Sequence, residues 1–441
     1  MVNPNQYSKN LRLICAGGVD QVTKNLFIFE YGNDILVVDC GIGFPDDPSP
    51  EEELILPDFS YLLTHQKKIR GLIISHAHFD HYGAVPNLLS KLNVPIFASQ
   101  LTCEFIKKKT EEFGIKPKDI DFRLISHKDN KIRIGAFEII PFHVNHSVPQ
   151  SLGLFIRTPI GNVFHVPDYK FDWTPVDEEP FDMQKVAFLA GQRKPLLLLS
   201  DCLGSTKSGH TESEKVIEEN FEKIMNKTAG LVLITTVSSN ISRMRQAINA
   251  SIRTGRKIAF LGRSVEQSAE ISRSLGYFSL YKKHLIPARK IKHFPFSKIT
   301  LVTAGCYAQS GSALEKISQN KHRLIKLKSK DVVIFSADPS PPGVIGNVNR
   351  MINNLSRIGA TIYYYEIQEN LYVSGHGTAE DIKMLFALVK PKYFLPIGGD
   401  FRHMRSYQLL ATEMNYKEDQ VIFAKEKQPI EFSPKQELVV K

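Results

Sequence analysis

Short apolar runs separated by polar turns dominate the first 200 residues. Residues 25–41 hold two such runs on either side of Gly-Asn-Asp, a turn signal, and a third run covers 69–74. Similar pairs of runs cover 131–147 and 151–168, the second pair with a turn at 159–162. One short helix is expected within 82–93, followed by a strand at 94–99. The pattern predicts a region built mainly of paired strands.

The pattern changes from about residue 210. Residues 211–225 repeat apolar positions at helical spacing, with Thr211 and Ser213 as candidate caps. Apolar strands beginning near 230, 256 and 331 then alternate with helices such as 240–255. This alternation predicts a parallel sheet with crossover helices. A helix–strand unit at 379–400 comes after it.

No long polar linker separates the strand-rich first part of the chain from the region that starts near residue 210, so one domain is expected to be inserted into another. We expect a first domain made of 1–208 and 367–441, interrupted by a second domain at 209–366. A chain of 441 residues exceeds the length at which a single core stops growing, which agrees with more than one domain.

The composition is that of a globular protein, with 42% hydrophobic and 23% charged residues. No run of 18 apolar residues predicts a membrane helix, and the N-terminus lacks the apolar segment of a signal peptide. A cytoplasmic location without membrane partners is therefore expected. The net charge of +10 favours a polyanionic partner such as nucleic acid.

Five scattered cysteines include no Cys-x-x-Cys pair, which argues against a disulfide framework and against a thiolate zinc site. We expect them to be small buried apolar residues: Cys15, Cys40, Cys103, Cys202 and Cys306.

Residues 75–81, Ser-His-Ala-His-Phe-Asp-His, gather four metal-binding side chains directly after an apolar run. Lone histidines are usually surface residues, and a lone aspartate is usually a helix cap. Alternation along a strand end would project His76, His78 and Asp80 to one side, with His81 in the first turn of the next element. Imidazole and carboxylate are ligands that zinc prefers outside thiolate sites. The cluster therefore predicts a metal site.

Further candidate ligands end other predicted strands. His143 and His146 come after one strand, Asp168 ends another, and Asp39 ends the strand before the acidic loop. Each alone is more often a turn residue or a satisfied hydrogen-bond partner. Together with residues 75–81 they predict a centre for two metal ions.

His-Ala-His-Phe-Asp-His is the H-x-H-x-D-H signature of the metallo-β-lactamase superfamily. Stretches at 71–89, 143–161, 167–176, 196–201 and 371–397 also resemble ribonuclease J, a β-CASP nuclease of that superfamily. The resemblance covers about residues 11 to 432. It implies an α/β fold, an αββα metallo-β-lactamase sandwich with an inserted α/β β-CASP domain. The extra C-terminal domain that ribonuclease J usually carries is expected to be absent.

The resemblance also implies residue roles. His76, His78 and His146 would bind a first zinc ion, Asp80 and His81 a second, and Asp168 would bridge both. Asp39 would support the site from behind the ligands. Asp80, Asp201 and His376 form the implied catalytic set, with His376 donating a proton to the leaving group. RNA-binding positions are implied at Ser238, Ser239, Asn240, Arg263, Ser264 and Ser374.

One position departs from the family pattern. The family has Pro-x-His-Gly-Glu near the end, where the histidine binds the second zinc, but this chain has Pro-Ile-Gly-Gly-Asp, with Gly398 at that place. Asp400 and His403 already have counterparts in the family, so neither is an obvious replacement. We expect the second zinc ion to bind more weakly than the first.

The expected function is zinc-dependent hydrolysis of RNA phosphodiester bonds, by exonuclease attack from the 5′ end, by internal cleavage, or both. The expected substrate is single-stranded RNA with a 5′-monophosphate, and the expected assembly is a homodimer or a hetero-oligomer with a paralogue. A second hypothesis is an RNA-binding, catalytically impaired partner of an active paralogue, favoured by Gly398. A third is a small-molecule metallohydrolase, which the large insertion and the basic charge disfavour.

Overall fold

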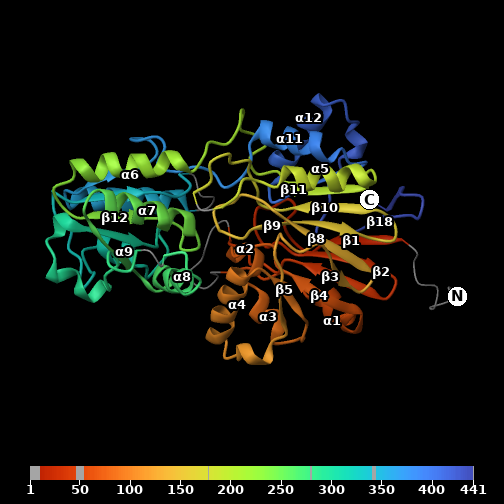
Figure 1. Ribbon diagram of the computed structural model, residues 1–441, viewed down its shortest axis with the longest axis horizontal. Helices are drawn as coiled ribbons and strands as arrows, with labels where there is room; N and C mark the ends of the chain where they lie inside the picture. Colours follow the sequence, from red (N-terminus) through yellow and green to blue (C-terminus); the bar gives the residue numbers. More distant parts are fainter. Residues whose placement is uncertain (1–9, 46–53, 177, 279–280, 340–343, 441) are drawn as a thin grey trace.

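A computed structural model of the chain describes residues 10–45, 54–176, 178–278, 281–339 and 344–440. Figure 1 shows two facing sheets with helices on their outer sides, and a separate third sheet covered by its own helices. We call the first unit the sandwich and the second the insert.

The first sheet of the sandwich has eight strands in the order β19-β18-β1-β2-β3-β4-β5-β6. Neighbouring residues of one strand face different cores, as in β2, where Phe27 and Phe29 pack between the sheets and Ile28 packs on the outer side. The strands are β1 (Leu11–Cys15), β2 (Phe27–Tyr31), β3 (Asp34–Val38), β4 (Ile69–Ile73), β5 (Ile96–Ala98), β6 (Phe122–Leu124), β18 (Pro429–Phe432) and β19 (Leu438–Val440).

The second sheet has six strands in the order β17-β11-β10-β9-β8-β7. Its inner face meets the first sheet through side chains such as Ile139, Leu154 and Leu197. The strands are β7 (Ile132–Ile134), β8 (Phe137–His143), β9 (Leu152–Arg157), β10 (Asn162–Val166), β11 (Leu197–Asp201) and β17 (Tyr393–Ile397).

Helices cover both outer faces of the sandwich. Side chains of α1 (Ser60–Thr64), α3 (Val85–Leu89) and α4 (Gln100–Glu112) join the core outside the first sheet. Side chains of α5 (Met183–Gln192), α11 (Ala379–Val389) and α12 (Phe401–Glu413) join the core outside the second. The expected four-layer αββα architecture is confirmed. Short 3-10 turns lie at η1 (Gln66–Lys68), η2 (Pro117–Asp119) and η6 (Glu418–Gln420).

The insert is a five-stranded parallel sheet in the order β13-β14-β12-β15-β16. Its strands are β12 (Val232–Thr235), β13 (Lys257–Leu261), β14 (Ile299–Thr303), β15 (Val332–Phe335) and β16 (Thr361–Tyr363). Its helices are α6 (Lys215–Lys227), α7 (Ile241–Arg253), α8 (Arg263–Ser274), α9 (Ala313–Ser318) and α10 (Ile345–Arg357), with 3-10 turns η4 (Ala288–His293) and η5 (Phe296–Lys298). The predicted parallel sheet with crossover helices is confirmed, and the boundaries at 209 and 366 stay a prediction.

Neither Thr211 nor Ser213 is the N-cap residue of the helix that they precede, because α6 begins after Glu214, which has no side-chain cap bond. The Ser213 hydroxyl nevertheless accepts a bond from the backbone N of Lys215, the first residue of α6, and also bonds to Thr174. Thr211 instead donates from its backbone N to Asp381 and from its hydroxyl to the carbonyl of His376. These bonds to Thr174, Asp381 and His376 attach the connecting segment to the sandwich.

Four buried charged side chains join the sandwich to the insert. Lys170 Nζ lies 3.4 Å from Asp172 Oδ2 and 3.6 Å from Glu214 Oε1, and Arg243 Nη2 lies 2.8 Å from Glu214 Oε2. All four side chains are almost fully buried. Removing one member of such a buried group typically costs about 3–5 kcal/mol, because it leaves a partner charge uncompensated. This quartet holds the insert beside the loop after β10.

All five cysteines are free and buried, as expected. Among the described residues, no helix is long and apolar enough to cross a membrane.

Candidate metal centre

The histidine-rich loop is not an extended strand end. β4 stops at Ile73, His76 and His78 lie in the loop after it, and Asp80 and His81 lie in the short helix α2 (Phe79–Tyr82). The prediction from strand alternation was therefore wrong about the local geometry. A tight turn, rather than period-two alternation, brings the four side chains together.

The first group of candidate ligands combines His76, His78, His146 and Asp168, whose donor atoms all lie within 4.8 Å of one another. Asp168 Oδ2 lies 3.5 Å from Nε2 of His76 and 3.3 Å from Nε2 of His146. The loop after β4, the loop after β8 and the loop after β10 each contribute to this group.

The second group combines Asp80, His81 and Asp168. His81 Nε2 lies 3.4 Å from Asp168 Oδ1 and 3.5 Å from Asp80 Oδ2. The two oxygens of Asp168 therefore face different groups, which is the arrangement that a bridging ligand needs.

Asp39 orients the histidine loop from behind. It lies directly after β3 with φ +61° and is fully buried. Its carboxylate accepts bonds from the backbone N and hydroxyl of Ser75 and lies 2.8 Å from Nδ1 of His81. Such a bond fixes the ring so that the other nitrogen is free to bind a metal.

The histidines of the first group suit a cation. His146 donates through Nδ1 to the carbonyl of Gly375 at 2.7 Å, so in the neutral ring its Nε2 carries a lone pair. That Nε2 lies 3.0 Å from Nδ1 of His78, whose Nε2 bonds to Ser147. Nε2 of His76 is buried and has no hydrogen-bond partner among the described residues. Converging nitrogens and an ionised carboxylate fit a tetrahedral zinc site.

The electrostatics of the two groups differ, and each is compatible with a bound metal ion. Burial lowers the pKa of His78 and His146 well below the usual range, so both rings are neutral, as metal ligands must be. Burial alone would lower the pKa of His81, but Asp168, Asp80 and Asp39 raise it well above the usual range. Three carboxylates thus stabilise a positive charge at the position where a metal would replace the proton.

His376 lies beside the first group. Its ring centroid is 5.2 Å from that of His146, and its Nδ1 is 2.6 Å from Oδ2 of Asp201. Burial alone would lower the pKa of His376, but Asp201 and Asp168 raise it to about 9. Asp168, Asp201 and His376 also form a third set whose donor atoms lie within 4.8 Å.

Gly398 comes directly after β17 with φ +69°, and its N donates to the carbonyl of Gly18. A Cβ at this position would lie 3.5 Å from Oδ1 of Asp201, an ordinary contact distance. Space for a side chain therefore exists on the side of Asp201. Asp400 and His403 do not fill it, because they form the reciprocal capping bonds at the start of α12.

The predicted RNA-binding residues of the insert lie at the carboxyl ends of its strands. Ser238, Ser239 and Asn240 come after β12, and Asn240 caps α7 by accepting from the N of Arg243. Arg263 and Ser264 begin α8 after β13 and are exposed.

Ser374 lies closer to the candidate metal centre. Its hydroxyl oxygen accepts a bond from the backbone N of His376. Ser374 therefore links the predicted RNA-binding set to a residue that lies beside the metal groups.

His143 does not join any donor group among the described residues, although it is only three positions before His146. Its Nε2 bonds instead to the carbonyl of Glu179. The orienting residues Asn25, Ser75 and Ser147 were not predicted. Only Ser75 and Ser147 had a signal, since each adjoins a predicted ligand.

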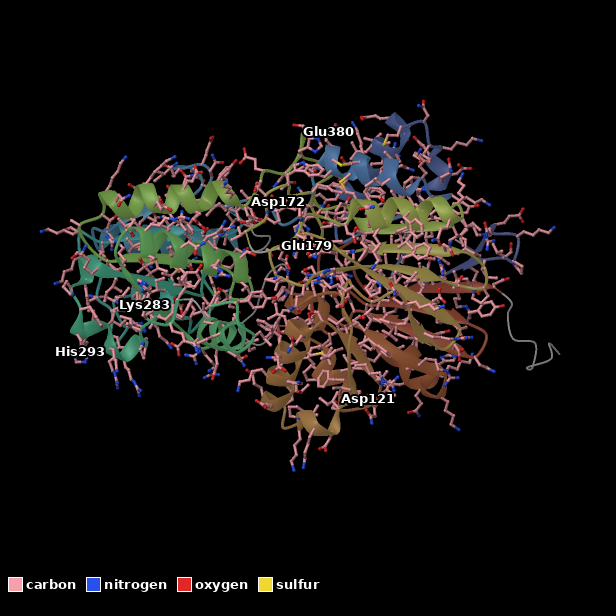
Figure 2. The ribbon with its side chains drawn as sticks, viewed as in Figure 1. Asp121, Asp172, Glu179, Lys283, His293 and Glu380 are labelled. Atoms are coloured by element: carbon pink, nitrogen blue, oxygen red, sulfur yellow. The ribbon has the colours of Figure 1, made fainter. Side chains whose placement is uncertain are left out.

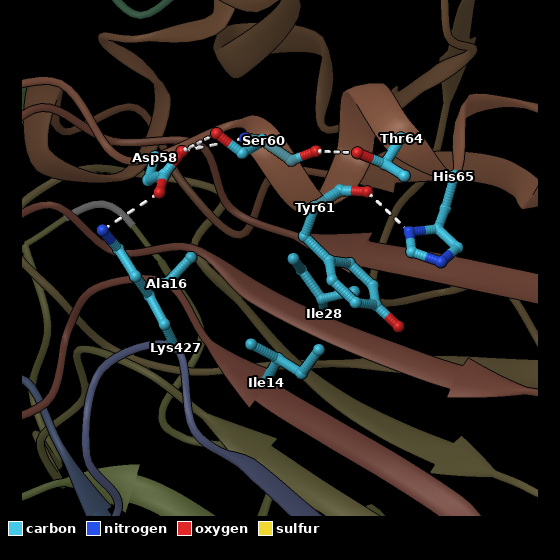
Figure 3. Close-up of a pocket in the computed structure, with 9 residues that line it drawn as sticks. All are labelled: Ile14, Ala16, Ile28, Asp58, Ser60, Tyr61, Thr64, His65 and Lys427. Atoms are coloured by element: carbon cyan, nitrogen blue, oxygen red, sulfur yellow. Dashed lines mark hydrogen bonds and ion pairs between the residues drawn. The ribbon is translucent and has the colours of Figure 1, made fainter.

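A cavity of about 240 Å³ lies at a different place in the sandwich. Ile14, Ala16 and Ile28 form its apolar floor beneath Tyr61, and an ion pair between Asp58 and Lys427 closes one end (Figure 3). None of the candidate metal ligands lines it. The candidate centre is therefore identified by its donor atoms and not by cavity size.

Three family models match the chain. The metallo-beta-lactamase superfamily matches residues 19–190, "Ribonuclease J, beta-CASP domain" matches 229–355, and "Zn-dependent metallo-hydrolase RNA specificity domain" matches 364–421. The first and third models cover parts of the sandwich, and the second covers most of the insert.

Curated relatives match along 96% of the chain. Ribonuclease J of Helicobacter pylori is 35% identical over 425 residues, and the chain spans 61% of that relative's length. Ribonuclease J 1 of Streptococcus pyogenes is 33% identical, with 74% of its length covered. Ribonuclease J2 of Bacillus subtilis is 30% identical, with 76% covered.

A solved structure of a protein of unknown function from Enterococcus faecalis shares the fold. Its TM-score is 0.65 at 14% identity, over 96% of this chain and all of that chain.

Proposed function

The chain belongs to the ribonuclease J family, and we propose that it is a metal-dependent ribonuclease that hydrolyses RNA phosphodiester bonds. The observation that carries the proposal is the position of Asp168, whose two oxygens face two separate groups of candidate ligands. A single carboxylate shared in this way suits two metal ions, the arrangement that stabilises both oxygens of an in-line phosphoryl displacement.

The metal ions of the proposal are zinc. His76, His78, His146 and Asp168 would hold the first, and Asp80, His81 and Asp168 the second. When bound, the pair would lower the pKa of a water molecule and neutralise charge on the phosphate. Asp39 keeps His81 oriented, and Ser147 and the Gly375 carbonyl orient His78 and His146.

His376 is the proposed proton donor to the leaving oxygen. Its ring packs against that of His146, and Asp201 holds its Nδ1 so that Nε2 is the nitrogen free to face a substrate. A positioned histidine of this kind contributes roughly 10²–10⁴-fold to a rate.

The proposed substrate is single-stranded RNA with a 5′-monophosphate, cut from its 5′ end or internally. Support comes from the match of residues 364–421 to an RNA specificity domain and from the names of the relatives. The exposed Arg263 and Ser264 and the turn at Ser238–Asn240 provide donors at the carboxyl edge of a parallel sheet, where such sheets commonly bind ligands.

A second candidate is an RNA-binding paralogue with impaired catalysis. The observation in its favour is that the group of Asp80, His81 and Asp168 has three side chains and that Gly398 adds none. Three protein ligands still suit a catalytic zinc site, since such sites keep an open position for water.

The test measures zinc content and RNA hydrolysis on the same preparation, with single-stranded RNA carrying 5′-monophosphate. The ribonuclease proposal expects bound zinc, turnover, loss of turnover after chelation and recovery on adding zinc back. Zinc binding and RNA binding without turnover would establish the impaired paralogue. Turnover that persists without metal would overturn both.

A further inference from the structure

The positive charge of this chain is concentrated in one stretch of the insert. Residues 271–330 contain thirteen Lys and Arg and a single acidic residue, Glu315, for a net charge of +12. The whole chain sums to +10, so the other 381 residues sum to −2. We call the exposed side of the described residues within 271–330, namely 271–278 and 281–330, the basic surface.

Every one of these thirteen side chains belongs to an exposed residue, and none makes an ion pair within the described part of the chain. They are Arg273, Lys282, Lys283, Arg289, Lys290, Lys292, Lys298, Lys316, Lys321, Arg323, Lys326, Lys328 and Lys330. Three lysines of the sandwich behave differently. In α4, Lys107, Lys108 and Lys109 each pair with a glutamate three positions away. The basic surface therefore carries positive charge that no carboxylate of the described chain offsets.

The basic surface lies away from the candidate metal centre. Arg243, in the helix after β12, bonds to Glu214, and Ser336, directly after β15, bonds to Leu371, so the carboxyl ends of these strands face the sandwich. Lys298 and Lys330 precede β14 and β15 and lie at the opposite, amino edge. Strands of four to five residues separate the two edges by about 15 Å.

Figure 2 places His293 at the end of the insert that is farthest from the sandwich, with Lys283 nearer the middle of the insert in this view. Neighbouring lysines add to the effect of desolvation in lowering the pKa of His284 and His322, which shows that the local field is positive. A field of this kind extends about 8 Å at physiological ionic strength, so it acts on polyanions approaching from solution.

We propose that the basic surface is a second RNA-binding site, which holds the phosphate backbone of a single-stranded segment outside the cutting site. The inference rests on the proposed function, because the ligand is another part of the same RNA. Exposed lysine and arginine heads without a rigid bidentate frame bind phosphates without reading bases. The site would raise the affinity for long RNA and leave short RNA unaffected.

The test replaces Lys282, Lys283, Lys290 and Lys292 by glutamine in the full zinc-loaded chain. The control variant replaces four exposed lysines of the sandwich, Lys116, Lys118, Lys128 and Lys194, and removes the same charge. Fluorescence anisotropy measures binding of 2′-O-methyl RNA, which resists hydrolysis, at lengths of about six and about 30 nucleotides. Each titration is repeated over a range of salt concentrations.

The proposal expects the first variant to bind the long RNA at least about tenfold more weakly, with the salt dependence of log K reduced by roughly 3. Binding of the short RNA should not change, and the control variant should stay close to the unmodified chain. Equal losses in the two variants, or unchanged binding of long RNA, would overturn it. So would loss of binding only to phosphatidylglycerol vesicles, which would identify a membrane as the partner.

Measuring cleavage of the short RNA distinguishes a failure of this inference from a failure of the proposed function. Both variants should cleave short unmodified RNA at the rate of the original chain. If the original chain binds long RNA through the basic surface but cleaves nothing, the ribonuclease proposal fails and the second binding site stands.

Discussion

The two oxygens of Asp168 face unequal surroundings. On the Oδ2 side, His76, His78 and His146 supply three imidazoles. On the Oδ1 side, His81 and Asp80 supply one imidazole and one carboxylate. Residues 76–81 supply ligands to both groups, so the difference arises from a distant segment: His146, after β8, adds a third imidazole on the Oδ2 side. An intact histidine motif therefore does not guarantee two equivalent sites.

Replacing Asp168, the ligand that both groups share, should lower metal content and RNA turnover more than any other substitution. Asp168→Ala should release both metals and lower RNA turnover by roughly 10³-fold or more, because it removes charge stabilisation from both sides. Elemental analysis and turnover on one preparation check this, with circular dichroism as the control for folding. Retention of one full zinc equivalent would show that one group binds without the bridge.

His376→Ala tests whether the third set, with Asp168 and Asp201, belongs to metal binding at all. We expect turnover to fall by roughly 10²–10⁴-fold while zinc content stays the same, because His376 is proposed to move a proton and not to hold a metal. His376→Gln is the matched variant that keeps a polar side chain. A loss of zinc in parallel with turnover would reassign His376 as a ligand.

Substitutions of the residues that orient the ligands should change the metal affinities of the two groups separately. Asp39→Asn acts on His81 and should weaken metal binding on the Oδ1 side by roughly 10–100-fold, while Ser147→Ala acts on His78 and should weaken the Oδ2 side. Titration with a competing chelator resolves the two affinities. If either change weakened both sites equally, the two groups would not be independent.

Gly398→His should have the mildest effect, and it alone should add function. Its imidazole would add a donor near Asp201 and raise zinc content toward two per chain, against a strain of about 1–2 kcal/mol for a side chain at φ +69°. Gly398→Ala carries the same strain without the donor, so it should lose stability and gain no zinc. Elemental analysis and thermal unfolding of both variants check this. Two tightly bound zinc ions in the unmodified chain would show that no ligand is missing.

Much of this asymmetry could be predicted from the sequence. The ligands of residues 75–81 lie within one turn, so spacing alone brought them together. Gly398 was identified only through the resemblance, because a glycine carries no chemical signal of its own. The choice between His143 and His146 was not available from spacing, since it depends on how the chain turns after β8.

The parts of the site that could not be predicted depend on contacts between segments that are far apart in the sequence. Asp201 and His376 are 175 positions apart, and an isolated bridge between Gly204 and Thr378 holds the segments that follow them side by side. The quartet that joins the sandwich to the insert likewise combines distant segments, and the sequence pattern does not distinguish its charges from solvated surface. Local pattern predicts elements and their type, but it does not encode which charged side chains become buried partners.

The pairing of β11 with β17 also determines how late in synthesis the sandwich can complete its second sheet. Asp201 leaves the ribosome before the whole insert, and Ile397, which pairs with it, is made 196 residues later. At about 5–20 residues per second that interval is about 10–40 s. The pairing of β1 with β18 forms later still, because β18 begins at Pro429. The insert, whose strands all lie between 232 and 363, can therefore complete its sheet while the sandwich still lacks these partner strands.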